Sequence, residues 1–408
     1  MNKNRNSLVL LVSAVVVSAV LTFIITASIF IGWKQFYPDS IKFDTSQVKS
    51  ENIAKFNTVR NLLKSEYYEN VNENTLLEGA ISGMVSSLGD RYTSYFSAQQ
   101  WQSIQEDILG SFTGVGITIT RQSDGSMQID NVYSDSPAMK IGIKVNDRII
   151  KVEGEDIRAI KDKAEVFDLV RGTGSSKVKL TIFRPADEKI IDFDIVKGKI
   201  KVDNIQSKML PDSIGYIRID KFDGEIASFF NQKLDSLISN GMKGLIIDVR
   251  DDPGGYYDQV CDIADRLLPK DVIVYTEDKF KVKKIEYSDS KELGLPLVIL
   301  INGNSASASE ILSGAIKDNK KGILIGTKTF GKGLVQKPTP LGDGSGLNIT
   351  IARYFTPSGI CIHGIGIMPD IEVEPALKYK TTKASEIPKE EDLQLLKAIE
   401  VIGNQIIK

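Results

Sequence analysis

The strongest constraint on the fold is an alternation of short apolar runs with a serine and a lysine. Residues 296–302 and 322–326 are apolar runs of the buried-strand type, and residues 308–318 have apolar side chains at helical spacing. Ser307 lies between the first run and the helix, and Lys332 lies in a glycine-rich turn after the second run. The order is therefore strand, serine, helix, strand and lysine, which predicts an α/β core.

Ser307 and Lys332 are also the most informative pair of reactive side chains. The chain has a single histidine, His363, so a Ser-His-Asp triad would depend on that one residue. A serine nucleophile needs a nearby base, and a lysine can act as that base only if its pKa falls from roughly 10.4. Apolar neighbours such as Phe330 and Leu334 favour this fall, because desolvation disfavours the ammonium. The pattern indicates Lys332 rather than His363 as the base.

The backbone around Ser307 offers donors for a developing oxyanion. A serine at the start of a helix lies at the positive end of the helix dipole, and the N–H of Ala308 is the first predicted donor. A second strand, over 244–250, is broken by the glycine turn at 251–255 before a helix over 256–268. That turn either supplies a further donor or is only a tight connection.

Four stretches resemble, in order, the motifs of the carboxyl-terminal processing peptidases, also called tail-specific proteases. They are Asp-Pro-Gly-Gly at 252–255, Ser-Ala-Ser-Ala-Ser-Glu-Ile at 305–311, Thr-Phe-Gly-Lys-Gly-Leu-Val-Gln at 329–336 and Ala-Arg-Tyr-Phe-Thr-Pro-Ser-Gly at 352–359. The resemblance implies a serine endopeptidase in which Ser307 is the nucleophile, Lys332 is the general base and Gln336 orients the lysine. It implies an oxyanion hole lined by Ala308, Gly254 and Gly255, and it gives no role to His363 or Cys361.

Residues 110–198 resemble a PDZ domain. The stretch Phe-Thr-Gly-Val-Gly-Ile at 112–117 is similar to the loop that binds the C-terminal carboxylate of a peptide. The carboxylate-binding residues that this resemblance implies are Gly114, Val115, Gly116 and Ile117. A β-rich spacer with glycine turns is the alternative.

The beginning of the chain predicts a membrane anchor. Residues 7–32 carry no charge, and Lys3 and Arg5 precede them. Such a length spans a hydrocarbon core of about 30 Å. We predict a cytoplasmic N-terminus at 1–6, a single-pass transmembrane anchor at 7–33 and a catalytic part on the extracytoplasmic side of a bacterial cell membrane. A cleaved signal peptide is the alternative.

The predicted fold class is α+β and multidomain. The transmembrane helix is followed by a helical region at 34–109, which the resemblance implies helps to form a homodimer, with a helical stalk as the alternative. The PDZ domain at 110–198 is inserted before a serine protease domain at 199–375, an α/β domain with a crotonase-like core. The C-terminal region at 376–408 carries a predicted amphipathic helix, which packs on its own domain or pairs with a second protomer.

Composition excludes several classes of function. The net charge of −2 gives no support for nucleic-acid binding. The sequence has no metal-ligand spacing and no phosphate-binding loop, so no metal or cofactor is predicted, and Cys261 and Cys361 are predicted to be free thiols.

The predicted function is that of a membrane-anchored serine endopeptidase. Its partners would be protein or peptide substrates with accessible C-termini, whose tails dock on the PDZ domain and whose chains are cleaved through an acyl-enzyme. A non-catalytic PDZ scaffold and an acyl-CoA enzyme of the crotonase type are the alternatives.

Overall fold

A computed structural model describes residues 50–108, 110–160, 166–167, 169–170, 177–289 and 291–407. The chain divides into two units, Met1–Ala80 and Ile81–Lys408. The described part of the first unit contains helix α2 (Ser50–Glu66) and the start of helix α3 (Glu73–Ser86). Glu73 forms ion pairs with Arg60 at 3.0 Å and with Lys64 at 2.8 Å, which join the two helices.

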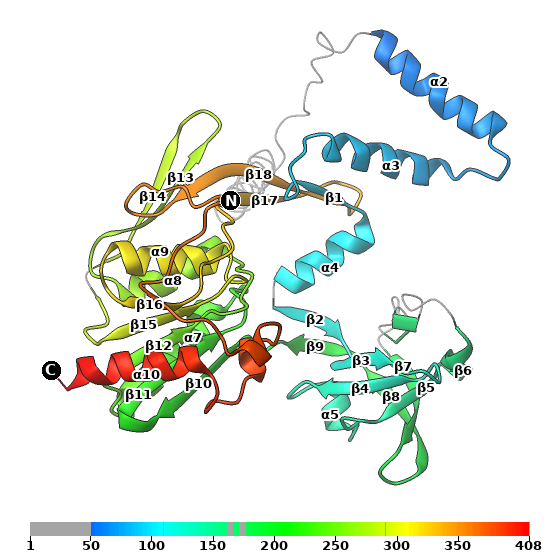
Figure 1. The fold of residues 1–408 in the computed structure, drawn as a ribbon. Helices are drawn as coiled ribbons and strands as arrows, with labels where there is room; N and C mark the ends of the chain where they lie inside the picture. Colours follow the sequence, from blue (N-terminus) through cyan, green and yellow to red (C-terminus); the bar gives the residue numbers. More distant parts are fainter. Residues whose placement is uncertain are drawn as a thin grey trace, which may run out of the picture. The chain divides into compact units, whose positions relative to one another are not determined.

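The second unit contains an antiparallel sheet in the region expected to be a PDZ domain (Figure 1). The strand order is β3-β4-β5-β7-β8, and β6 pairs with β5. The strands are β3 (Ile117–Arg121), β4 (Met127–Val132), β5 (Arg148–Val152), β6 (Glu155–Asp156), β7 (Lys177–Arg184) and β8 (Lys189–Val196), with helix α5 (Pro137–Lys140) after β4. A separate pair of strands, β2 (Ser111–Gly114) and β9 (Gly198–Lys201), joins the two ends of this region. The core of the region includes the fully buried Met127, Ile129, Ile149 and Leu180.

A six-stranded sheet forms the centre of the predicted protease core. Its order is β10-β11-β12-β15-β16-β19, and the strands from β11 onward are parallel. The strands are β10 (Ile205–Leu210), β11 (Ile214–Ile219), β12 (Gly244–Asp248), β15 (Leu297–Ile301), β16 (Ile323–Gly326) and β19 (Ile371–Glu372). The central strands β12, β15 and β16 are nearly continuous apolar runs, as expected for parallel strands that are buried on both faces.

Helices cover both faces of this sheet (Figure 1). Successive residues of β12 point to opposite faces, so Leu245 and Ile247 contact one core cluster and Ile246 contacts the other. Helices α7 (Ile226–Ser239), α8 (Tyr257–Leu267) and α9 (Ala308–Asp318) pack on the first face, and helix α10 (Leu393–Ile406) packs on the second. The predicted amphipathic C-terminal helix is therefore α10, and it buries its apolar face on its own sheet.

A second sheet, β1-β18-β13-β14 with β17 paired to β18, lies beside the predicted catalytic residues. Its strands are β1 (Ser94–Phe96), β13 (Val272–Asp278), β14 (Lys283–Tyr287), β17 (Leu334–Pro340) and β18 (Gly346–Phe355). Strand β17 begins directly after the glycine turn of Lys332 and carries Gln336. Strand β1 follows helix α3 in the chain and precedes helix α4 (Ala98–Ile108), and it pairs with β18.

A buried ionic network joins helix α10 to the end of strand β12. Both terminal nitrogens of Arg250 contact the carboxylate of Asp392, the N-cap residue of α10, at 2.8 Å. Arg250 also contacts Asp248 at 2.7 Å, and all three side chains are almost completely buried. Burial disfavours the charged carboxylate, but the guanidinium groups of Arg250 and Arg218 and the hydroxyl of Tyr216 together outweigh this effect and lower the pKa of Asp248 to about 2.

The predicted fold class is wrong in one part, the transmembrane helix. Spanning a bilayer takes about 20 predominantly apolar residues. No helix among the residues that the structure describes is long and apolar enough for this. The predicted anchor at 7–33, with residues 1–6 and 34–49, lies outside the described residues.

Candidate active site

Ser307 occupies a strained position between β15 and α9. Its backbone φ is 57° and ψ is −112°, a conformation that residues with a side chain rarely adopt. It is the N-cap residue of α9, and its own N–H donates to Glu310 Oε2 at 2.9 Å. This strained turn places the serine at the start of a helix, as the sequence predicts.

The buried carboxylate of Glu310 joins the serine turn to the lysine turn. Besides the N–H of Ser307, it accepts hydrogen bonds from the N–H of Lys332 at 2.8 Å and the N–H of Gly331 at 2.7 Å. The hydroxyl of Thr329 donates to it at 2.6 Å. Four donors therefore converge on one side chain with no solvent exposure, and the two catalytic candidates are held by the same group.

Tyr354, on β18, gives a second link between the two turns. Its hydroxyl lies within hydrogen-bond distance of the carbonyl oxygens of both Ser307 and Lys332. The side chain is 1% exposed, and burial raises its pKa well above the usual range, so the hydroxyl keeps its proton and can donate.

The Lys332 side chain is half-buried and points toward an aromatic ring. Its Nζ lies 5.0 Å from the centre of the Tyr92 ring. Burial lowers the pKa of Lys332; Glu310 opposes this shift, and the guanidinium of Arg91 adds to it. Within the described residues the ammonium hydrogen-bonds to neither Ser307 nor Gln336, whose amide donates a long hydrogen bond of 3.5 Å to the hydroxyl of Thr350.

The predicted oxyanion donors lie next to Ser307, and one of them is already engaged. The N–H of Gly254 donates to Asp252 Oδ1 at 2.7 Å. Burial raises the pKa of Asp252 well above its usual range, and its Oδ2 has no partner among the described residues. In the same described part of the chain, the N–H groups of Gly255 and Ala308 have no hydrogen-bond acceptor. These two are therefore the donors that an oxyanion could use without breaking an existing bond.

One cavity of about 430 Å³ brings the predicted catalytic residues together. Its lining includes all six of them: Ser307, Lys332, Gln336, Ala308, Gly254 and Gly255. Apolar side chains from α9 and β17 and the ring of Tyr257 complete the wall.

Gly254 allows a close approach that a larger residue would prevent. A Cβ at this position would lie 2.7 Å from the Cβ of Ser307 and 2.8 Å from the nitrogen of Ala308, and the backbone φ is +100°. We expect Gly254→Ala to lower kcat about 100-fold or more, because displaced oxyanion donors cost roughly this much. Gly241→Ala is the control in a peptide-cleavage assay, since Gly241 has a φ of +83° but no atom within 4 Å of its added Cβ. Equal activity of the two variants would contradict the prediction.

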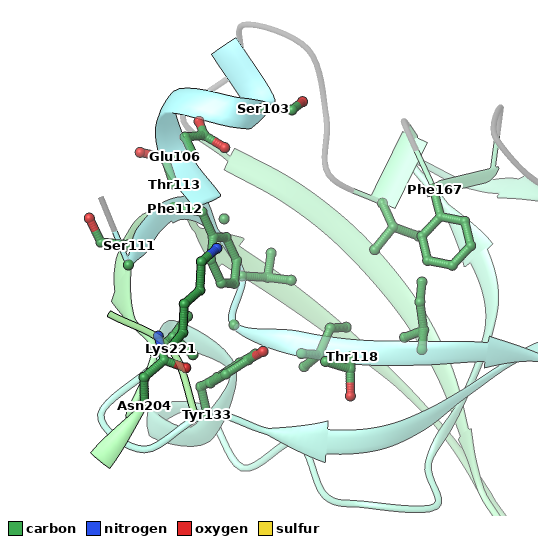
Figure 2. Close-up of a pocket in the computed structure, with 18 residues that line it drawn as sticks. Ser103, Glu106, Ser111, Phe112, Thr113, Thr118, Tyr133, Phe167, Asn204 and Lys221 are labelled. Atoms are coloured by element: carbon green, nitrogen blue, oxygen red, sulfur yellow. The ribbon is translucent and has the colours of Figure 1, made fainter. Parts of the chain in front are cut away.

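The predicted peptide-binding loop lines a second cavity, of about 620 Å³ (Figure 2). The carbonyls of Val115 and Gly116 accept hydrogen bonds from Ala138 and Tyr133, at 2.9 and 3.0 Å. Among the described residues the N–H groups of Val115 and Gly116 have no acceptor, and Gly114 and Ile117 flank them at the ends of β2 and β3. The apolar part of the lining includes Phe112, Tyr133, Phe167 and Val170. The cavity can thus offer backbone donors beside an apolar surface.

Three contributors to the site were missed by the sequence analysis. Glu310 had a recognisable signal, because Ser307 and Glu310 have the spacing of a capping box, in which an acidic residue returns to the N-cap backbone. Tyr354 lies in the motif at 352–359, but no neighbouring residue indicates that its hydroxyl contacts the carbonyl oxygens of Ser307 and Lys332. Tyr92 lies in the stretch 90–96, which resembles a motif of the same family, but the sequence predicts no role for it, and nothing local indicates its contact with Lys332, 240 positions away.

Three regions of the chain match known families. Residues 213–373 match Peptidase family S41, residues 128–184 match the PDZ domain, and residues 16–100 match the Activating protease CtpB N-terminal domain.

Individual relatives match most of the chain. The Carboxy-terminal processing protease CtpA of Bacillus subtilis is 35% identical over 368 residues, which cover 90% of this chain and 76% of the relative. The Carboxy-terminal processing protease CtpB of the same organism is 35% identical over 338 residues, which cover 81% and 70%. The crystal structure of a putative S41 protease from Bacteroides fragilis has a similar fold, with a TM-score of 0.50 and 15% identity over 85% of this chain and 97% of that one.

Proposed function

The chain belongs to peptidase family S41, with the carboxy-terminal processing proteases, and from this premise we propose how its serine peptidase activity is carried out. Ser307 is the nucleophile, Lys332 is the general base and Gln336 is the residue that positions the lysine. The observation that carries the proposal is the Glu310 carboxylate, which binds the backbone N–H groups of Ser307 and Lys332 at 2.9 and 2.8 Å. This shared buried acceptor supports the proposal because it holds the backbone turns of Ser307 and Lys332 next to each other.

The reaction starts when the neutral Lys332 amine turns from Tyr92 toward Ser307 and takes the proton of its hydroxyl. The serine oxygen attacks the peptide carbonyl, and the N–H groups of Ala308 and Gly255 donate to the oxyanion that forms. Collapse of this intermediate breaks the C–N bond, and the Lys332 ammonium gives its proton to the leaving amine. Lys332 then takes a proton from a water molecule, which attacks the ester carbonyl; the C–O bond to Ser307 breaks, and the Lys332 ammonium returns the proton to the serine oxygen.

The acyl-enzyme mechanism is tested by labelling with a fluorophosphonate, which reacts with activated serines. We expect the parent chain to gain one phosphonyl group on the peptide that contains Ser307, detected by mass spectrometry after digestion. We expect Lys332→Met to lose this labelling, because the serine then has no base. Cleavage of casein with no label on Ser307 would overturn the assignment, and inertness in both assays would favour a PDZ scaffold.

We also propose that the PDZ domain selects substrates by their C-terminal tails. The free N–H groups of Val115 and Gly116 can receive a terminal carboxylate, and the apolar cavity wall can receive the last side chains of the tail. Phe167 belongs to this wall and is 38% exposed, so it can be replaced with little cost to the core.

We expect Phe167→Ser to lower kcat/KM about fivefold to tenfold for a substrate with a free apolar C-terminus. Loss of about 1 kcal/mol of apolar contact has this effect. The same substrate with an amidated C-terminus should be cleaved at nearly the same rate by parent and variant. Ile190→Ser is the control, because Ile190 is exposed on β8 and does not line the cavity. A uniform loss for both substrates would argue against tail selection.

Two further predictions concern assembly and location. Apolar side chains on α2, including Ile53, Phe56 and Leu62, are exposed, which is the surface that a homodimer would use. The homodimer and the extracytoplasmic location of the catalytic part stay predictions.

A further inference from the structure

The loop before strand β1 lies against the Lys332 turn and is firmly held there. Asp90 accepts hydrogen bonds from the N–H of Tyr92 at 2.9 Å and from the hydroxyl of Thr93 at 2.7 Å. The Thr93 oxygen in turn accepts from the N–H of Thr350, on β18, at 3.0 Å. Strand β1 then pairs with β18, the strand that also carries Tyr354 and borders β17. The loop is thus fixed to the sheet beside the active site.

The Tyr92 ring is in contact with the general base that the mechanism uses. Lys332 Nζ lies 5.0 Å from the ring centre, and Arg91 Cζ lies 4.9 Å from the same ring and 5.4 Å from the ring of Phe330. The imidazole of His363 meets the ring edge at 6.2 Å between centres. These distances are those of attractive contacts between cations or rings and an aromatic face.

We propose that Tyr92 is a positioning residue for Lys332, holding its amine in a partly water-excluded place beside the ring, from which it turns to Ser307. This inference rests on the proposed function of Lys332. It assigns a task to a loop that is far from Lys332 in sequence and lies in the segment that matches the Activating protease CtpB N-terminal domain, not in the S41 peptidase or PDZ segments.

The charges around Lys332 decide the direction of the expected effect. Arg91 and Asp90 face it from the loop, Glu310 from α9 and Tyr354 from β18, and the imidazole of His363 contacts the Tyr92 ring. Contact with the ring and the charge of Glu310 both favour the ammonium form of Lys332. Burial disfavours this form and outweighs them, so the pKa of Lys332 is lowered. Removal of the ring would admit water to Nζ, and the pKa would rise.

The sign of the activity change follows from the state that the base must have. Lys332 accepts a proton only when neutral, so kcat/KM rises with pH through the lysine pKa. A higher pKa moves this acid limb to higher pH, and each unit lowers the rate about tenfold at a pH below the limb.

The test is the pH dependence of kcat/KM and of the rate of fluorophosphonate labelling at Ser307. We expect Tyr92→Ala to move the acid limb upward by about one pH unit, with roughly tenfold lower kcat below the limb and little change in KM. Tyr92→Phe keeps the ring and should follow the parent. Tyr92→Leu, which fills more of the space than alanine, is the second variant if Tyr92→Ala does not fold, and it should shift the limb in the same direction.

The control is Tyr287→Ala, at an exposed tyrosine on β14. An unchanged acid limb in folded Tyr92→Ala and Tyr92→Leu would overturn the inference, as would an equal shift in Tyr92→Phe. Failure of the proposed function is distinguishable, because Lys332→Met would then still cleave with the parental pH profile. Loss of activity in Lys332→Met with parental limbs in the Tyr92 variants would overturn the role of Tyr92 alone.

Discussion

Replacing Ser307 with alanine is expected to lower kcat by about 10⁴- to 10⁶-fold, the largest effect of any single substitution in this chain. The substitution removes the atom that forms the acyl-enzyme, and losses of this size are typical of serine nucleophiles. Binding of substrate should persist, because the cavity and the PDZ domain are unchanged. The measurement is cleavage of a fluorogenic peptide, with active-site concentration taken from fluorophosphonate labelling of the parent.

The neighbouring serines are the controls for this experiment. Ser305 donates to the carbonyl of Val249 at 2.8 Å, and Ser309 donates to the carbonyl of Asp252 at 3.0 Å, so both are engaged with the backbone. Ser305→Ala and Ser309→Ala should lower stability by about 1 kcal/mol each and keep most of the activity. If Ser307→Ala kept more than about 1% of parental activity while Ser305→Ala or Ser309→Ala lost it, the nucleophile would be assigned to the wrong serine.

Replacing Glu310 with alanine is expected to lower both stability and activity. Four buried donors would lose their acceptor, which costs about 3 kcal/mol or more. The turns of Ser307 and Lys332 would also lose their common anchor, and we expect kcat to fall about 100-fold, since small displacements of catalytic groups have effects of this order.

Glu310→Gln removes the negative charge of this side chain and keeps its shape. Each carboxylate oxygen of Glu310 accepts two hydrogen bonds, so an amide nitrogen in either place would face two donors. Glutamine should therefore be almost as damaging as alanine in thermal unfolding and in peptide cleavage. The control is Glu292→Gln, which breaks a surface ion pair with Lys321 at 2.9 Å and should cost less than about 1 kcal/mol. A parental melting temperature for Glu310→Gln would refute the anchoring role.

The sequence predicts the elements of the core well where the signal is local. The apolar runs at 296–302 and 322–326 are strands β15 and β16, and the helical spacing over 308–318 is helix α9. The two strands are short, nearly continuously buried apolar runs, and the sequence of the helix has apolar side chains at helical spacing, so a short window contains the information.

The family could be predicted from the motifs, whereas the roles of the site residues stay predictions. The motifs indicated the family, and the relatives show it. The six predicted catalytic residues line one cavity, but their roles stay predictions.

Contacts between distant segments could not be predicted from patterns. Nothing in the sequence near Lys332 indicates that Tyr92 covers its amine, and nothing near Arg250 indicates a partner in the last helix. Both contacts depend on the three-dimensional path of the chain. The transmembrane helix of the predicted fold class is the opposite case. An apolar run with a clear local signal predicts it, but no described helix is long and apolar enough to cross a membrane.

The Arg250 network has a consequence for the order of events during synthesis. Arg250 leaves the ribosome 142 residues before Asp392, the residue that binds both of its terminal nitrogens. A nascent chain that contains Ser307 and Lys332 but not yet Asp392 therefore lacks the carboxylate that binds both terminal nitrogens of Arg250, close in sequence to the turn that carries Gly254 and Gly255. The contact between Arg250 and Asp392 can therefore form only after helix α10 has begun to be synthesised, when the predicted catalytic residues have already been translated.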